Sequence, residues 1–406
     1  MSSTTRSSPW PVVGALAVTQ IVSWGSIFYA FSVLLAPIEH ETGWGRGAIV
    51  GAFSLSVLVT GLAGTPVGAL IDRFGGRLVM SVGSVLAAAL LSALSRIHSL
   101  LAFYLIWAAL GIAAAMLLYE AAFTVIYKAF TTNARNAVTA LTLCAGFAST
   151  IFWPLTQAFV SAIGWRDTVL ALGLMNLVLC LPLHFWVLPD TGESAKPAVR
   201  AERVPNARLQ ATLRTPVFWL LAVAFTANIL AFAALSVHLI PLLQEKGFSA
   251  ERAVWLAALV GPMQVSGRLL QFMFGRDLSS THVGLIALLV LPIGLIALVF
   301  VTHGLWLGLF FVACYGASNG VMTVVRATLP AELFGSEHYG AVNGALSTPV
   351  IVTRAAAPIA AALLWTAMGD YDAVLWVLTA FGLVAVLVLY LALRASPGAS
   401  TKHRLN

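Results

Sequence analysis

Arginines lie within three long apolar stretches of this sequence, where a permanent positive charge is unusual. They are Arg268 in "GPMQVSGRLLQFMFGR", Arg326, and Arg354 in "STPVIVTRAAAPIAA". An arginine side chain stays protonated in proteins, and a charge at the centre of a membrane helix costs about 2.5–3.5 kcal/mol on insertion scales. Such a group must face water or a partner anion, and the planar guanidinium fork suits a carboxylate.

The place of each arginine within its apolar stretch indicates its depth. Arg268 is separated from Arg276 by about 12 Å of helix, in a hydrocarbon layer about 30 Å thick, so it lies near the midplane. Arg354 also falls near the middle of its stretch. We interpret both as binding a substrate carboxylate; the alternative is a structural role, bonded to backbone carbonyls or to Glu120. Arg326 is close to the end of its stretch and can extend to the headgroups, so we interpret it as structural.

Two titratable side chains could carry a proton. Glu120, in "LLYEAAFTVIYKAF", is the only acid deep in an apolar stretch. Because burial raises the pKa of a carboxyl group towards neutral, it is either a proton carrier or a fixed partner for an arginine. His238 titrates in a suitable range, but it lies near the end of its stretch, where a histidine is usually only hydrated. It is therefore either a coupling or gating residue or a hydrated side chain.

The composition identifies lipid as the main solvent of this chain. Of its 406 residues, 60% are hydrophobic and 9% are charged, whereas a soluble protein has about 25% charged residues. The net charge of +7 could indicate nucleic-acid binding, but the basic residues cluster in short connections, as the positive-inside rule predicts. We therefore expect no nucleic acid as a partner. The three cysteines have no metal-ligand spacing, and we expect no cofactor.

Apolar runs of about 20 residues, the length that crosses a membrane, predict twelve spans. They are residues 11–37, 47–71, 78–96, 100–127, 137–163, 167–188, 216–243, 252–275, 283–302, 304–328, 340–367 and 372–394. A polar, basic segment at 189–215 divides them equally. We therefore predict an N-terminal six-helix bundle at 1–188, a cytoplasmic linker, and a C-terminal six-helix bundle with a short tail at 216–406, an arrangement typical of duplicated transporters.

Lysines and arginines are concentrated in the central segment, at the chain ends and in alternate connections. The positive-inside rule then predicts that both termini are cytoplasmic. The short loops favour a bacterial inner membrane.

The connection after the second predicted span, "GALIDRFGGR", resembles the signature loop of the major facilitator superfamily. The resemblance implies an all-α membrane protein of twelve helices in two pseudo-symmetric bundles, and a loop that locks one of two alternating states. Its residues would be Gly68, Asp72, Arg73, Gly75 and Arg77. Glycine at 68 would permit close helix approach, the aspartate would face the positive N-terminus of another helix, and the arginines would bind headgroups. An ordinary charged turn is the alternative.

Within this superfamily the chain is most similar to the monocarboxylate and oxalate–formate porters. The similarity rests on "SWGSIFYAFSVLLAPIEHETGW", "HLIPLLQEKGFS" and "SGRLL". It implies a substrate-binding role for Arg268, and Arg354 lies in the span where the oxalate porter has a lysine. Gln264 replaces an aspartate of the animal monocarboxylate porters, which argues against their proton relay. On spans that line the cavity of this fold, residues able to hydrogen-bond a small anion are Tyr119, Tyr315 and Asn319, although the tyrosines could equally be packing residues.

These features predict a secondary transporter of small organic anions, either mono- or dicarboxylates. We expect alternating access, with a proton symported or a counter-anion exchanged, in a monomer embedded in the lipid bilayer. The alternative is proton-coupled efflux of drugs or metabolites through Glu120, although the fifth span lacks the glycine–proline signature of drug antiporters. A membrane sensor on the same fold is a further alternative. An enzyme is not expected, because no nucleophile–base pair, metal cluster or phosphate loop is evident.

Overall fold

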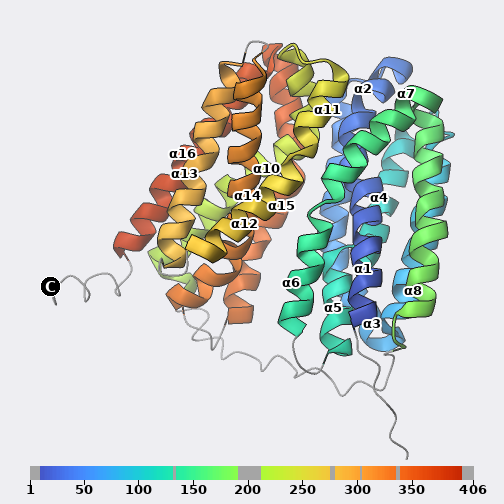
Figure 1. Cartoon of the computed structure of the whole chain (residues 1–406), viewed down its shortest axis with the longest axis horizontal. Coiled ribbons are helices and arrows are strands. Elements are labelled where there is room, and N and C mark those ends of the chain that lie inside the picture. The colour runs from blue at the N-terminus through green and yellow to red at the C-terminus, as the bar shows by residue number, and fades with distance from the viewer. Residues whose placement is uncertain are drawn as a thin grey trace, which may run out of the picture. The chain divides into compact units, whose positions relative to one another are not determined.

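A computed structural model of the chain describes residues 10–130, 134–190, 212–274, 279–301, 304–334 and 339–395 (Figure 1). Within these ranges the secondary structure is helical. The first half contains α1 (Trp10–Ser23), the π-helix η1 (Trp24–Tyr29), α2 (Ala30–Thr42), α3 (Arg46–Leu94), α4 (Leu100–Leu117), α5 (Tyr119–Ala129), α6 (Ala134–Ala145), α7 (Ala148–Met175), the π-helix η2 (Asn176–Cys180) and α8 (Leu181–Val187). The second half contains α10 (Pro216–Glu245), α11 (Ala250–Ala258), α12 (Val260–Phe274), α13 (Ser280–Val299), α14 (Leu305–Phe334), α15 (Tyr339–Met368) and α16 (Tyr371–Ala395).

Two of the ten candidate spans in the described residues are far longer than one membrane crossing. They are Arg46–Leu94, with 49 residues, and Asn136–Val187, with 52 residues. At 1.5 Å per residue each is more than about 70 Å long, over twice the hydrocarbon thickness. Each contains a glycine with non-helical backbone angles, Gly75 (φ 81°, ψ 156°) in the first and Gly164 (φ 76°, ψ 168°) in the second. Counted as two crossings each, they bring the candidates to the twelve predicted spans.

The chain divides into two compact units, Met1–Ala198 and Val199–Asn406. In Figure 1 the first runs from blue to green and the second from yellow to red. The division falls within the predicted linker at 189–215, most of which lies outside the described residues.

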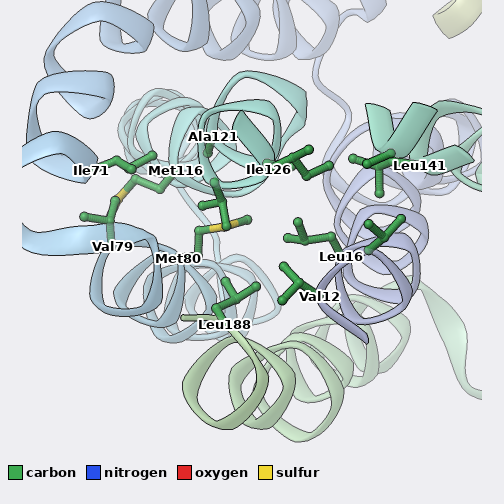
Figure 2. Packing of buried hydrophobic residues seen from close by; sticks show 14 of the residues in the cluster. Val12, Leu16, Ile71, Val79, Met80, Met116, Ala121, Ile126, Leu141 and Leu188 are labelled. Carbon is green, nitrogen blue, oxygen red and sulfur yellow. The ribbon is translucent and has the colours of Figure 1, made fainter. Parts of the chain in front are cut away.

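The core of the first unit holds the signature loop in place. Figure 2 shows apolar side chains of α1, α3, α4, α5 and α6 packed against one another. Among the fully buried members are Leu16, Ile71, Met80, Ile126 and Leu141. Since Ile71 directly precedes Asp72, the packing that buries the isoleucine also fixes the loop residues that follow it.

The core of the second unit fixes the middle of α14. Its buried members include Phe218 and Leu221 of α10, Leu288 of α13, Val325 of α14 and Leu389 of α16. Val325 is fully buried and directly precedes Arg326. Burial of the valine therefore determines which direction the arginine can take on its helix.

Candidate functional site

The second unit contains a close crossing of α12 and α14 that depends on glycine. A Cβ added to Gly267 would lie 2.7 Å from Ala317 Cα, and one added to Gly320 would overlap the Gln264 carbonyl oxygen. Gly316 and Gly320 are four residues apart, so they share one face of α14, and this small-residue spacing lets membrane helices approach backbone to backbone. The spacing is readable in the sequence and indicates this crossing.

Arg268 is positioned by that crossing. It follows Gly267 on α12, its side chain is half-buried, and its Nε donates a hydrogen bond to the Gly320 carbonyl oxygen at 3.3 Å. A side chain larger than hydrogen at either glycine would move this carbonyl away from the guanidinium. The backbone bond is the structural role that we considered as an alternative, and it also fixes the orientation of a group that could bind an anion.

Arg326 does not occupy the helix-end position that we predicted. The apolar stretch ends near residue 328, but α14 continues to Phe334, so Arg326 lies well inside the helix. Its side chain is half-buried and its Nε donates to Met322 O at 3.3 Å. Arg354 on the neighbouring α15 is also half-buried, and the two guanidinium groups are close enough to repel each other electrostatically. This proximity depends on helix packing and has no local sequence signal.

Tyr315 and Asn319, the two candidate anion ligands on α14, differ in their surroundings. Tyr315 is buried, stacks on Phe311 with ring centroids 5.5 Å apart, and its hydroxyl donates to Phe232 O at 3.3 Å. These contacts are those of a residue that packs α14 on α10. Asn319 is half-buried and lies one residue before the Gly320 carbonyl that binds Arg268.

His238 is buried in the second unit, not hydrated at a helix end. Its Nδ1 lies 2.8 Å from the Tyr371 hydroxyl and its Nε2 lies 2.9 Å from Pro358 O. A carbonyl can only accept, so Nε2 donates a hydrogen bond to Pro358 O, and Nδ1 forms a second hydrogen bond with the tyrosine hydroxyl. The imidazole thus joins α10, α15 and α16, which is sufficient to explain its burial.

Glu120 lies two residues after a break in the fourth predicted span. The helix α4 ends at Leu117, whose carbonyl accepts a hydrogen bond from Gln20 Nε2 at 2.5 Å. Leu118 is extended (φ −82°, ψ −166°), and Glu120 is in the first turn of α5 with an exposed side chain. The burial that our proton-carrier hypothesis assumed is therefore absent. A carboxylate in a first turn is instead stabilised by the helix dipole.

Tyr119, the other candidate in this span, belongs to an aromatic cluster. Its ring is 5.1 Å from that of Trp24 and stacks on Phe123 at 5.3 Å with an interplanar angle of 13°. Trp24 also contacts Phe28 and Tyr29. Trp24 and Tyr29 lie on η1, and single π-helical turns occur frequently at functional sites. Phe123 is three residues after Glu120, so the two are neighbours on the surface of α5.

The signature loop contains an ion pair that the sequence did not predict. Lys128 Nζ lies 2.8 Å from Asp72 Oδ1 and also donates to Ile71 O at 3.0 Å. Within the described structure the aspartate thus has a lysine as its partner. The loop is closed on its other side by Arg77, whose Nε donates to Leu188 O at 2.8 Å.

The glycines and the other arginine of the loop differ in what surrounds them. Gly75 has a positive φ, which glycine adopts without strain. A Cβ on Gly76 would overlap Val125, whereas one on Gly68 would meet no atom within 4 Å. The close approach expected at Gly68 therefore occurs at Gly76. Arg73 is exposed, with its guanidinium 4.9 Å from the Phe74 ring.

The helix lengths, the apolar spans and the signature loop define the class of this protein as a multi-pass helical membrane transporter. Residues 16–278 match the Major Facilitator Superfamily. The chain belongs to this superfamily, and it is a transporter, not an enzyme.

Two curated relatives are similar in sequence. One is an uncharacterized 38 kDa protein in the 23S RNA operon of Thermoproteus tenax, 27% identical over 337 residues, which cover 81% of this chain and 82% of the relative. The other is monocarboxylate transporter 4 of Mus musculus, 28% identical over 253 residues, which cover 59% of this chain and 52% of the relative. The chain thus spans about half the length of the mouse transporter.

Two solved structures share the fold. A bacterial homolog of the human lysosomal transporter Spinster, in an inward-facing and occupied conformation, matches with a TM-score of 0.72 and 15% identity over 96% of this chain and 97% of that one. A variant of the nucleoside transporter NupG matches with a TM-score of 0.74 and 12% identity over 95% and 99%. At these identities the likeness concerns the fold alone.

Proposed function

We propose that this transporter carries small organic anions, either mono- or dicarboxylates, by alternating access. The observation that supports the proposal best is the set of three half-buried arginines on spans of the second unit: Arg268, Arg326 and Arg354. Arg326 and Arg354 repel each other. A bound carboxylate would reduce this repulsion and could accept parallel hydrogen bonds from one guanidinium fork.

The positions of two acidic residues in the second unit, Glu245 and Asp372, also support the proposal. Both lie at helix ends and have partners there. Glu245 accepts hydrogen bonds from Trp365 Nε1 at 2.8 Å and from Tyr371 N at 2.7 Å. Asp372 forms an ion pair with Lys246. These contacts hold both carboxylates at the ends of their helices, and a substrate carboxylate would add negative charge near the arginines.

The similarity to a protein named monocarboxylate transporter 4 also favours a carboxylate substrate. Coupling is proposed to be either proton symport or anion exchange. For symport, Glu120 is a better candidate than His238, because both ring nitrogens of the histidine already have partners within the second unit. The proposal includes an inner-membrane location with cytoplasmic termini, supported by the distribution of basic residues.

One observation favours proton-coupled efflux of drugs or metabolites as a second candidate. Glu120 is an exposed acid next to a group of aromatic rings that includes Tyr119, Phe123 and Trp24. Aromatic faces and a carboxylate together attract organic cations. A substrate recognised here would be a lipophilic cation, and its binding would depend on Glu120 instead of Arg268.

Thermal unfolding of the purified protein with candidate ligands tests these two functions. A ligand at a hundred times its Kd stabilises the folded state by about 2.7 kcal/mol. We expect mono- or dicarboxylates to stabilise the wild type and Arg252→Gln, a control at an exposed position on α11, but not Arg268→Gln. Stabilisation of all three proteins by a lipophilic cation, with no response to carboxylates, would instead favour efflux.

A further inference from the structure

The second unit has an apolar cleft of about 260 Å³ formed by α12, α13 and α14. Its lining includes Gly267 and Ala317, which meet at the close helix crossing, together with Leu270, Phe274 and Ile286. Each of the three helices belongs to a span that is long and apolar enough to cross a membrane. The cleft is therefore at membrane depth, on the helices that position Arg268.

The surroundings of the cleft indicate hydrocarbon as its occupant. Leu270, Phe274 and Ile286 are 54%, 71% and 56% exposed, respectively, so the walls of the cleft continue onto an apolar surface. Ser318 is polar, but its hydroxyl donates to Ala287 O at 2.6 Å and needs no further partner. Water is stable in a cavity only where it finds two to four polar partners, and this lining offers few.

One polar atom of the lining lacks a partner. Gln271 Oε1 is buried and accepts no hydrogen bond from any residue in the described ranges. Gln271 is in the last turn of α12, whose described part ends at Phe274. The candidate span ends at Phe274, about one turn beyond Gln271, so the glutamine side chain can extend towards the lipid headgroups. A buried carbonyl-type acceptor at this level calls for a donor.

We propose that the cleft binds a phospholipid, with an acyl chain in the apolar cavity and a donor from the headgroup on Gln271 Oε1. Phosphatidylethanolamine has N–H donors in its headgroup, whereas the trimethylated nitrogen of phosphatidylcholine has none. The cleft therefore selects the ethanolamine lipid. The bound chain packs against the Gly267–Ala317 contact, so it also supports the helix crossing beside Arg268.

Native mass spectrometry of the purified protein tests this site with an equal mixture of the two phospholipids that have identical chains. We expect the wild type to retain phosphatidylethanolamine in preference to phosphatidylcholine. Ile286→Trp fills the cleft and should lose both lipids, and Val290→Phe is a smaller change at another lining residue with the same expected effect. Ile293→Trp is the matched control, because Ile293 is also exposed on α13 but does not line the cleft.

The headgroup contact is tested separately with Gln271→Leu. This variant should keep its bound lipid but lose the preference for phosphatidylethanolamine by about three- to tenfold, the effect of one hydrogen bond. Unchanged lipid retention in folded Ile286→Trp or Val290→Phe overturns the cleft assignment. A preference that survives Gln271→Leu overturns the headgroup assignment. Both readouts are independent of which substrate is transported.

Discussion

Arg268 Nε donates a hydrogen bond to the carbonyl oxygen of Gly320, 3.3 Å away on the neighbouring helix. The bond exists because Gly267 and Gly320 let α12 and α14 touch along their backbones. The position of the guanidinium therefore depends on two uncharged residues that have no side chain. A change at either glycine is expected to act on anion binding through geometry alone.

Gly320→Ala is expected to lower both stability and carboxylate binding. The added Cβ would overlap the Gln264 carbonyl oxygen, so the helices must separate, and overpacking of this kind costs about 1–3 kcal/mol. Gly344→Ala is the control, because a Cβ there meets no atom within 4 Å. Thermal unfolding and ligand-induced stabilisation report the two effects. Equal behaviour of the two variants would mean that the crossing tolerates a methyl group.

Arg268→Lys is expected to weaken carboxylate binding by about tenfold or more, although it keeps the positive charge. Lysine lacks the planar fork that binds a carboxylate through two parallel bonds. In arginine, Nε can bind the Gly320 carbonyl while the two terminal nitrogens bind an anion, and the single lysine nitrogen cannot do both in this geometry. Arg252→Lys, at an exposed site on α11, should change nothing. Calorimetric titration measures both. Affinity retained in Arg268→Lys would show that charge is sufficient.

The number of crossings could be predicted from the sequence because lipid imposes it locally. Every span needs about 20 apolar residues, and the charged or glycine-rich interruptions at Gly75 and Gly164 coincide with the backbone kinks. Arg268 could be identified for a similar reason. A charge within an apolar run is costly in a membrane however its helix packs, so its presence indicates a role.

Features that depend on contacts distant in sequence could not be predicted. The break at Leu118 has no proline or glycine beside it, and the buried carbonyl of Leu117 accepts a hydrogen bond from Gln20, far away in the chain. The burial of His238 requires Tyr371 and Pro358 from two other helices. The pairing of Asp72 with Lys128 likewise joins residues of α3 and α5.

Asp72→Asn is expected to change transport far more than stability. The Asp72 side chain is 68% exposed, so water screens its carboxylate and weakens the ion pair. Lys128 would also keep its bond to Ile71 O. If the loop locks one transport state, uptake into proteoliposomes should slow severalfold while thermal unfolding barely shifts. Asp167→Asn, an exposed aspartate on α7, controls for loss of charge.

The result for Asp72→Asn has two other possible outcomes. A large fall in thermal stability together with slower uptake would mean that the loop has only a structural role. Uptake equal to that of Asp167→Asn would mean that Asp72 has no part in the transport cycle. In a double-mutant cycle with Lys128→Gln, a coupling energy near zero would assign any effect to the aspartate itself.

Glu120→Gln is expected to abolish the dependence of uptake on an imposed pH gradient if transport is proton-coupled. The carboxylate lies within the fourth predicted span, two residues after the extended Leu118, and glutamine preserves its shape but not its proton exchange. Glu251→Gln is a matched control, since Glu251 is also exposed in the first turn of its helix. Proteoliposomes with defined internal and external pH provide the measurement.

His238→Gln completes this comparison. It should reduce stability by about 1–3 kcal/mol, because a buried hydrogen-bonded group loses at least one partner, and leave the response to the pH gradient intact. A gradient response lost in His238→Gln and kept in Glu120→Gln would reverse the two roles. If the wild type shows no gradient response but exchanges internal for external carboxylate, anion exchange is the coupling mode, and the first-turn carboxylate of α5 then has no proton to carry.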